Sequence, residues 1–457
     1  MAINRKTVVG AIDPDVLAFT EGKDPILDLA LAQWDCIGTA AHVTMLSRMA
    51  VTPAIFSREE RNAVVAELRE IIQDAKEGRF CITAEDQDVH LAVERRLTAK
   101  LGELGRRVHT GRSRNDQVAV DIRLHVRSEL VALSEEIAML SGALIAFGKR
   151  HAKVPMVGRT HLQPAMPTTV GCWASGWGET LLDDLIVLEG ARRFNNRNPL
   201  GSAAGYGVPL PLDRGLTTRL LGFDAPLQNV FHASNARGKD EAVLLDALKQ
   251  VMLTLSRMAE DLILFSMPEF GYFRLPRELC TGSSIMPQKY NPDLLELIRA
   301  KAALLLGYST AASAVIKAMP GGYNRDLQDT KELYMEGLRV TRGSVRIMML
   351  LAGRLAVDEG RLRAAFAEPG VFATDAALEL VAGGMPFRDA YHQIRDHLED
   401  LRGMDPDAVL ARKRHLGAGY GVDYAALAAR AAEAKREAKA AAKAIERTVG
   451  ALLKPLR

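Results

Sequence analysis

The sequence predicts an all-α fold, in which a central bundle of long helices lies between smaller helical domains at the N- and C-terminal ends of the chain. Three observations predict this fold. Apolar residues recur every three or four positions over stretches that are much longer than an average helix. Alternating runs of β-branched residues bounded by turns, which are typical of strands, are sparse. Segments rich in glycine and proline separate the long stretches.

The longest periodic stretch begins near Asn115. Its apolar residues are separated by three or four positions and therefore share one helix face: Ile122, Val126, Leu130, Leu133, Ile137, Leu140, Leu144 and Phe147. Either Ser113 or Asn115 is suited to cap the start of this helix. At 1.5 Å per residue, the helix is expected to be about 45 Å long or more.

Further long helices are predicted at 168–194, 244–265, 292–318 and 327–355. Apolar seams that repeat every seven residues require partner helices alongside, so these stretches favour a bundle. A bundle of this length is expected to bury some of its faces against other subunits, which predicts a homo-oligomer; a monomeric all-helical protein is the alternative. The segment 425–453 is rich in alanine, lysine, glutamate and arginine, and predicts a last helix with a solvated face.

The predicted domain boundaries divide the chain into an N-terminal helical domain (1–112), a central long-helix domain (113–360) and a C-terminal helical domain (361–457). Two long non-helical segments are expected, at 198–213 and 268–292. The second connects two long helices and is not of low complexity. Loops of that length within a compact domain are usually functional or disordered, and here function is favoured.

Composition excludes several classes of protein. A net charge of +3 over 457 residues argues against a nucleic-acid-binding protein. The first ten residues lack the apolar stretch of a signal peptide, and no uninterrupted apolar run has membrane-spanning length. The four cysteines are far apart and are expected to be reduced thiols: Cys36, Cys81, Cys172 and Cys280. We therefore expect a cytoplasmic protein with no nucleic-acid or membrane partner.

Cofactor motifs are also missing. Between Gly105 and Gly111 lie five residues, where a phosphate-binding loop has four, and Arg112 stands where that motif has lysine. The dinucleotide-binding glycine pattern and the H-E-x-x-H zinc pattern do not occur. The sequence therefore predicts neither a cofactor nor a metal.

The first polar cluster, 109–117 (HTGRSRNDQ), directly precedes the apolar face of the longest helix. Arg112 and Arg114 are suited to bind a carboxylate, and the free N–H groups at a helix start add positive potential. The cluster is therefore interpreted as an anion site. A simple capped helix start with solvated arginines is the alternative.

The second polar cluster, 158–169 (GRTHLQPAMPTT), contains Pro164 and Pro167, which delay the next helix until about Thr168. The stiffened turn before them holds three polar residues: Thr160, His161 and Gln163. A lone histidine is more often structural, but polar neighbours on a stiff backbone favour a catalytic histidine here.

The third polar cluster, 281–296 (TGSSIMPQKYNPDLLE), begins with a flexible segment rich in hydroxyl groups. Lys289 follows this segment. Asn291 is predicted to cap the next helix, with Pro292 as its first residue, and Glu296 lies just over one turn later. An ordinary loop before a capped helix is the weaker alternative.

Together the clusters fit a β-elimination. Such a reaction needs a base for a weakly acidic C–H, positive charge or N–H donors for the developing oxyanion, and an acid for the departing nitrogen. A serine acts as a base only where its alkoxide is stabilised, and Lys289, loop N–H groups and a helix start provide such stabilisation. His161 beside a carboxylate such as Glu296 forms a tunable acid.

The segment GSSIMPQKYNP (282–292) resembles the signature of the fumarase/aspartase superfamily. Within that superfamily the chain is similar to the argininosuccinate lyase family. The matching segments follow the same order and cover most of the chain: DLALAQWDCIGTAAH (28–42), DVHLAVERRL (88–97), HTGRSRNDQV (109–118), THLQPAMP (160–167), SRMAEDLILF (256–265), LLELIRAKA (294–302) and YNRDLQDTKE (323–332).

This resemblance implies an all-α homotetramer in which three subunits contribute to each active site. Ser283 matches the serine that removes the Cβ proton, and His161 matches the catalytic histidine supported by Glu296, although base and acid have been assigned both ways. The fumarate-side carboxylate is expected to contact Lys289 and Asn291, with Thr160, Ser113 and Asn115. The remaining substrate, including its arginine end, is expected to contact Tyr323, Gln328 and Lys331, with His90 and Arg112 as neighbours.

Three departures from the family pattern concern the choice of substrate. The tryptophan–glycine-rich start and a serine pair before Asp28 are absent, so a substrate-binding serine is missing or displaced. Tyr290 stands where many members have a second lysine, and Arg159 where tyrosine is frequent. Argininosuccinate is the favoured substrate. The alternatives are another N-substituted aspartate, such as adenylosuccinate or an aminopolycarboxylate, and an inactive crystallin-like structural homologue.

Overall fold

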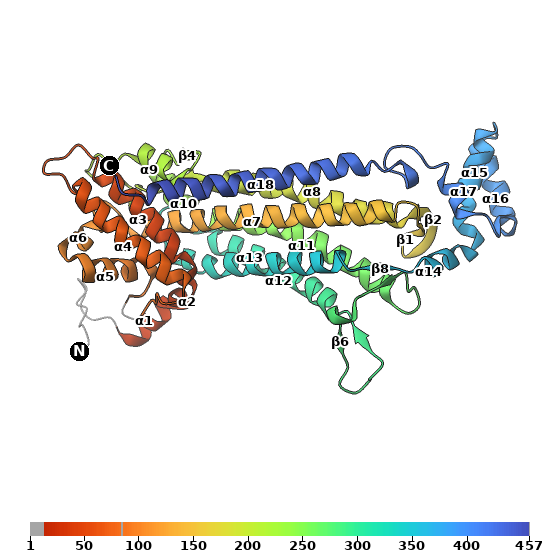
Figure 1. Ribbon diagram of the computed structural model, residues 1–457, viewed down its shortest axis with the longest axis horizontal. Coiled ribbons are helices and arrows are strands. Elements are labelled where there is room, and N and C mark those ends of the chain that lie inside the picture. The colour runs from red at the N-terminus through yellow and green to blue at the C-terminus, as the bar shows by residue number, and fades with distance from the viewer. Residues whose placement is uncertain (1–12, 84–85, 457) are drawn as a thin grey trace.

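The computed structural model describes residues 13–83 and 86–456 of the chain. The molecule is elongated: long helices occupy the middle, the N-terminal helices lie at one end, and a small group of helices lies at the other (Figure 1). The prediction about a signal peptide rests on the first ten residues, which lie outside the described part of the chain. The described residues confirm the predicted all-α fold.

Six long helices form the body of the molecule. All five predicted long helices are present, and the last helix of the chain joins them: α7 (Arg114–Arg150), α8 (Val170–Asn195), α11 (Lys239–Ser266), α12 (Asp293–Ile316), α13 (Thr330–Ala352) and α18 (Tyr424–Leu452). α7 packs on α8, α13 and α18, while α11 packs on α8, α12 and α13. The apolar faces that meet between them are buried in one continuous core.

α7 includes a stretch that is long and apolar enough to cross a membrane, and 56% of that stretch is buried inside the molecule. The burial has a packing explanation, because α7 contacts other helices on several sides. Its charged ends also suit a helix in water: Asp116 lies in the first turn, and Lys149 and Arg150 lie in the last. We therefore interpret α7 as the central core helix of the bundle.

The N-terminal helices cover one end of the bundle (Figure 1). Their order is α1 (Pro14–Glu21), α2 (Asp24–Leu27), η1 (Asp28–Leu31), α3 (Ala32–Leu46), α4 (Arg58–Lys76), α5 (Val89–Leu101), α6 (Glu103–Arg106) and η2 (Arg107–His109). α3 is buried along nearly its whole length and packs on α4, α5 and α7. It is therefore the element that attaches this group to the bundle.

A β-hairpin at the opposite end of α7 was absent from the prediction. β1 (Pro155–Thr160) and β2 (Gln163–Thr169) pair antiparallel, with a register irregularity between Val157 and Arg159. The prolines of β2 obscured the strand pattern, since proline is rare inside strands. The predicted stiff turn is the tip of this hairpin. Val157 packs against Phe366 and Phe372 of the C-terminal helices, which fixes the hairpin in place.

The remaining elements are short and connect the long helices. They are β3 (Arg197–Asn198), α9 (Arg214–Leu221), β4 (Ala225–Pro226), α10 (Val230–Ala236), β5 (Phe273–Arg274), η3 (Arg277–Leu279), β6 (Thr281–Gly282), β7 (Tyr290–Asn291), η4 (Arg325–Gln328) and β8 (Ala356–Val357). β3 pairs with β4, β5 with β8, and β6 with β7. The segment 198–213 is a loop apart from the end of β3, as predicted.

The chain after residue 360 has two parts. A compact group lies at the far end of the bundle: α14 (Glu359–Ala364), η5 (Ala365–Ala367), η6 (Pro369–Phe372), α15 (Ala373–Ala382), α16 (Phe387–Asp396), η7 (Leu398–Leu401), α17 (Pro406–Leu410) and η8 (Gly419–Gly421). α18 then runs back along α7, and Arg61 of α4 donates to the carbonyl oxygen of Leu452. The domain division at 112 and 360 remains a prediction, and α18 packs as part of the bundle.

Candidate active site

Five of the predicted substrate-binding residues line one cavity where the N-terminal helices meet the bundle: His90, Arg114, Tyr323, Gln328 and Lys331. We call this cavity the N-terminal pocket. Its other lining residues are Asp24, Asp28, Gln87, Asp88, Val118, Arg237 and Arg325. These residues come from five separate segments of the chain, so the fold, and not local sequence, brings the predicted group together.

The first helices of the chain occupy one wall of the N-terminal pocket. Lys331 is buried, and its Nζ lies 2.9 Å from Asp24 Oδ1 and 2.5 Å from Asp28 Oδ1. Gln328 Nε2 donates to the carbonyl oxygens of Thr20 and Glu21, at 3.1 and 3.3 Å. Burial raises the pKa of Asp24 in spite of its bond to Lys331. The ammonium group of Lys331 is therefore already paired with two carboxylates of its own chain.

The cluster at 109–117 begins α7, as predicted, and Ser113 is its N-cap. Ser113 Oγ accepts from the backbone N–H of Asn115, and Asp116 Oδ1 accepts from that of Ser113. Arg112 Nη1 donates to Thr39 Oγ1 at 2.8 Å, and Arg114 Nη1 lies 2.8 Å from Asp88 Oδ2. The two arginines therefore have protein partners, which orient them beside the pocket.

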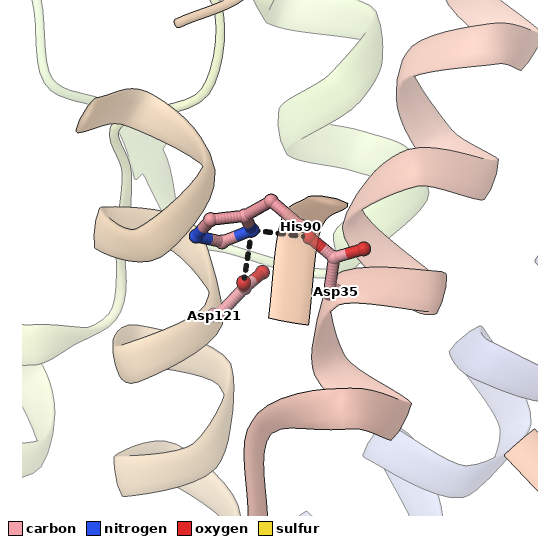
Figure 2. A group of neighbouring side chains, drawn as sticks. All are labelled: Asp35, His90 and Asp121. Carbon is pink, nitrogen blue, oxygen red and sulfur yellow. Dashed lines mark hydrogen bonds and ion pairs between the residues drawn. The ribbon is translucent and has the colours of Figure 1, made fainter. Parts of the chain in front are cut away.

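Behind the pocket, His90 lies between two buried carboxylates (Figure 2). Its Nδ1 is 2.6 Å from Asp35 Oδ2 and 3.6 Å from Asp121 Oδ2. Burial acts to lower the pKa of His90, but the hydrogen bond and charge of Asp35 raise it above the usual value. Burial, and then the charge of Asp35, raise the pKa of Asp121 well above its usual range.

The catalytic histidine predicted from the sequence lies at the other end of α7. His161 and Leu162 form the tip of the β1–β2 hairpin, where both have positive φ values, 54° and 62°. Non-glycine residues rarely adopt this conformation, and its occurrence is often associated with function. Thr160 and His161 are exposed to solvent. The hairpin therefore presents an imidazole outward from the end of the bundle.

Ser283 lies in a second hairpin, β6–β7, which projects from the side of the bundle (Figure 1). Ser283 Oγ accepts from the backbone N–H groups of Ile285 and Met286, at 3.3 and 3.1 Å. Lys289 is exposed in the same loop, and Asn291 pairs with Thr281 at the base of the hairpin. The serine oxygen therefore already receives the N–H donors that stabilise an alkoxide.

The helix that follows this hairpin begins one residue later than predicted. Its N-cap is Pro292 and its first residue is Asp293, so the prediction of Asn291 as the cap was wrong. Asn291 is instead held in β7 by the pairing with Thr281. Glu296 lies in the first turn of α12 and is exposed.

One chain does not bring these groups together. α7 has 37 residues, and it separates Ser113 from the β1–β2 hairpin by about 55 Å. Within residues 13–83 and 86–456, no hydrogen bond or ion pair joins Ser283, His161 and Glu296 to one another. A single subunit therefore carries the N-terminal pocket, the serine loop and the histidine hairpin as three separate parts.

Sequence reasoning missed four residues of this region: Asp24, Asp35, Asp121 and Arg237. Asp35 and Asp121 are charged residues inside otherwise apolar helical runs, which was an available signal, since buried charges need a partner. Arg237 lies over the ring of Tyr323, 5.6 Å from its centre. No local pattern marked Asp24 or Arg237, because the fold alone places them at the pocket.

Comparison with known proteins identifies the family of this chain. The sequence profile of the lyase family matches residues 30–307. Argininosuccinate lyase of Phocaeicola vulgatus is 41% identical over 386 residues, 84% of this chain and 85% of that protein. Argininosuccinate lyase of Sorangium cellulosum is 42% identical over 409 residues, 90% of this chain and 94% of that protein.

A solved structure, that of EDDS lyase in complex with formate, has a similar fold. Its TM-score is 0.77 at 24% identity, and the match covers 98% of this chain and 95% of that one. The likeness confirms the all-α architecture over nearly the whole length. With relatives about 40% identical along more than four fifths of the sequence, the chain belongs to the argininosuccinate lyase family.

Proposed function

We propose that this protein is a carbon–nitrogen lyase that splits argininosuccinate into L-arginine and fumarate by β-elimination, as a step of arginine biosynthesis in the cytoplasm. The observation that carries the proposal is the convergence of His90, Arg114, Tyr323, Gln328 and Lys331 on one pocket. The family resemblance implies that His90, Tyr323, Gln328 and Lys331 lie at the substrate, and the polar cluster at 109–117 predicts Arg114 as an anion-binding residue. The argininosuccinate lyases that match 84% and 90% of the chain support the same activity.

Ser283 is proposed as the base that removes the proton from the substrate Cβ. A serine hydroxyl is a weak base, so its alkoxide needs stabilisation. The N–H groups of Ile285 and Met286 already point at Oγ, and Lys289 adds a positive charge to the same loop. Lys289 and Asn291 also bind the carboxylate that takes up negative charge as the proton leaves.

His161 is proposed as the acid that protonates the departing nitrogen, with Glu296 as its carboxylate partner. The positive-φ tip of the β1–β2 hairpin holds the imidazole in solvent, where it is accessible to another subunit. Thr160, Ser113 and Asn115 complete the contacts to the fumarate half, and Arg112 lies beside them. The chain's own residues perform every step, so no cofactor or metal is required.

A homotetramer with shared active sites is part of this proposal. Because α7 separates Ser113 from His161 by about 55 Å, a site that uses both needs subunits running in opposite directions. Large apolar side chains are exposed on the long helices, as expected for faces that other subunits cover: Ile186, Val187, Leu297, Leu304, Leu306 and Leu350.

A second candidate is elimination from a different N-substituted aspartate, such as adenylosuccinate or an aminopolycarboxylate. The observation that favours it is the pairing of Lys331 with Asp24 and Asp28, which neutralises a cation expected to contact the arginine end. Tyr290, in place of a second lysine, also removes a positive charge from the serine loop.

The test is a fumarate assay across a panel of N-substituted aspartates. Purified protein mixed with argininosuccinate is expected to raise the ultraviolet absorbance as fumarate forms, with a kcat/KM that exceeds those for adenylosuccinate and an aminopolycarboxylate. The reverse order would replace the first candidate by the second. The absence of turnover with every member of the panel would leave an inactive structural homologue.

A further inference from the structure

The buried group behind the N-terminal pocket has an unusual hydrogen-bond pattern. Asp35 and Asp121 are each no more than 2% exposed. Asp35 Oδ1 and both carboxylate oxygens of Asp121 have no hydrogen-bond partner in the described part of the chain. An ionised carboxylate buried without donors is strongly destabilised, so the group requires a protonation state that removes this cost.

His90 connects these carboxylates to the pocket. Its Nδ1 faces Asp35 and Asp121, while Nε2 lies on the opposite side of the ring (Figure 2). His90 lines the N-terminal pocket, and its hydrogen bonds among residues 13–83 and 86–456 involve Nδ1 alone. The Nε2 atom is not among the fully buried polar atoms that lack a hydrogen-bond partner, so it is accessible from the pocket. The Nε2–H group is therefore free to donate to a ligand in the pocket.

The two carboxylates are not equivalent. Nδ1 carries a single proton, and Asp35 at 2.6 Å is within hydrogen-bond distance of it, whereas Asp121 at 3.6 Å is not. Two anions this close to each other in a buried site do not both stay ionised. Asp35 gains a charge-assisted bond from the imidazolium, and Asp121 gains none. The proton that the pair retains therefore resides on Asp121.

We propose that Asp35, as a carboxylate, and Asp121, as a neutral carboxylic acid, hold His90 as an imidazolium whose Nε2–H binds the α-carboxylate of the substrate's amino-acid half. Asp35 is then a positioning residue that acts through His90. The inference rests on the proposed function, because that function places the arginine half of the substrate in the N-terminal pocket.

The surroundings of His90 support a fixed positive charge. The titratable groups that face it come from five elements: Asp28 of η1, Asp35 of α3, Asp88 at the start of α5, His109 of η2 and Asp121 of α7. Arg112, in the loop before α7, acts on His109 and Asp121, and Lys331 of α13 acts on Asp121. The pKa of His90 is raised in sum, since the bond and charge of Asp35 outweigh burial. The imidazolium is therefore favoured over that of an ordinary histidine, and it is lost as the pH rises through the raised pKa of His90.

The same three side chains have ligand atoms within 4.8 Å of one another, an arrangement that also suits a divalent cation. A hydrogen bond explains the 2.6 Å separation of Nδ1 and Asp35 Oδ2 without a metal. The charge of Arg112, which acts on Asp121, also disfavours a second cation there. A metal at this position would use Nδ1 as a ligand and would contradict the proposal.

The first experiment compares L-arginine with agmatine, which is arginine without its carboxyl group, by calorimetric titration of the intact oligomer. Wild-type protein is expected to prefer arginine. The preference should fall by about tenfold or more in His90→Gln and in Asp35→Asn, because each removes the charged donor or its counter-ion. It should survive in Asp121→Asn, which replaces a neutral group by a neutral group of the same shape.

Asp35→Asn and Asp121→Asn are matched controls, since both are buried and both lie beside Nδ1. In wild type the arginine preference should fade as the pH rises through the raised pKa of His90, and in Asp35→Asn it should fade at a lower pH. In the His90→Gln background, Asp35→Asn should cause no further loss. Equal effects of the two asparagine variants, or additive effects of His90→Gln and Asp35→Asn, would overturn the proposal.

A second readout does not depend on substrate. The infrared difference spectrum between wild type and Asp121→Asn should contain the carbonyl stretch of a protonated carboxylic acid at neutral pH. A carboxylate band in its place, or a stoichiometric divalent cation in the purified protein, would contradict the assignment. Because this spectrum needs no turnover, it separates a failure of this inference from a failure of the proposed lyase activity.

Discussion

At the scale of single residues, the proposed chemistry uses a serine and a histidine that lie on two different hairpins. Ser283 Oγ is held by two backbone N–H groups, and His161 occupies a positive-φ turn. Neither side chain contributes to the buried core, so each can be removed without a cavity. Their substitution therefore tests chemistry separately from folding.

Ser283→Ala and His161→Asn are each expected to lower kcat by about a thousandfold or more, since each removes a proton-transfer group. The oligomer and the melting temperature should be unchanged. Turnover is followed by fumarate absorbance and assembly by analytical ultracentrifugation. A Ser283→Ala enzyme with near wild-type kcat would remove the serine as the base.

Leu162 tests the strain in the histidine hairpin. Its φ of 62° is unfavourable for a side chain with a Cβ, and it is 70% exposed, so little packing is lost on its removal. Leu162→Gly is expected to stabilise the protein by about 1 kcal/mol through relief of this strain. The measurement is chemical denaturation, with Leu416→Gly as a control at an exposed leucine outside the positive-φ region. A loss of stability in Leu162→Gly would show that the turn is unstrained.

The buried side chain of His42 is expected to make the stability of the protein depend on pH. It is fully buried, and a ring nitrogen lies 2.8 Å from the carbonyl oxygen of Thr110, close to the start of α7. Burial lowers the pKa of His42 well below the usual 6.5. The unfolded chain binds the proton of His42 more tightly than the folded chain does. The contribution of the neutral, buried His42 to the free energy of unfolding is therefore fully present above about pH 6.5 and is lost as the pH falls. Calorimetric melting from pH 8 to pH 5 should therefore fall less steeply in His42→Gln than in wild type; parallel curves would contradict the assignment.

At the scale of elements, the long helices were predictable because each has a continuous apolar face and a clear stop. The predicted limits 168–194 and 292–318 differ from α8 and α12 by one or two residues at each end. The β1–β2 hairpin was not predictable in this way. Its strand β2 contains Pro164 and Pro167, and its partner strand is held by Phe366 and Phe372, which follow about two hundred residues later.

The N-terminal pocket also could not be predicted from the periodic pattern of the sequence alone. His90, Tyr323 and Lys331 were assigned to the substrate because of the family resemblance, and their convergence follows from the packing of α5, the loop before η4, and α13. Of the two residues that pair with Lys331, Asp24 lies just before the first segment that matches the family, and Asp28 begins that segment. Short-range periodicity contains no information about such contacts between distant segments.

Substitution of Asp116, at the start of α7, is expected to destabilise the protein strongly. One carboxylate oxygen accepts from Ser113 N–H, and the other accepts from the N–H groups of Gly201 and Ala203 at 3.0 Å. Asp116→Ala leaves these three donors without a partner and is expected to cost about 3 kcal/mol or more. The exposed cap Asp423 also accepts two backbone N–H groups, and Asp423→Ala is expected to cost about 1 kcal/mol. Urea denaturation compares them, and equal costs would refute the role of Asp116 in joining the loop to α7.

At the scale of the whole molecule, the decisive feature is the length of the bundle. The N-terminal helices, which line the pocket, and the β1–β2 hairpin lie at opposite ends of α7, and the β6–β7 hairpin projects from the side of the bundle (Figure 1). Closed symmetric oligomers of antiparallel subunits bring opposite ends of identical chains together. Because no contact joins Ser283 to His161 within the described chain, the proposed shared active site requires that the two residues belong to different subunits.

Hybrid oligomers of Ser283→Ala and His161→Asn subunits test this requirement most directly. In a random one-to-one mixture, each site receives a wild-type Ser283 and a wild-type His161 with independent chances of one half, so about one quarter of the wild-type activity should return. Native mass spectrometry of differently tagged subunits verifies that hybrids form. If verified hybrids stay as inactive as the two parent variants, the active site is not shared in this way and the account is wrong.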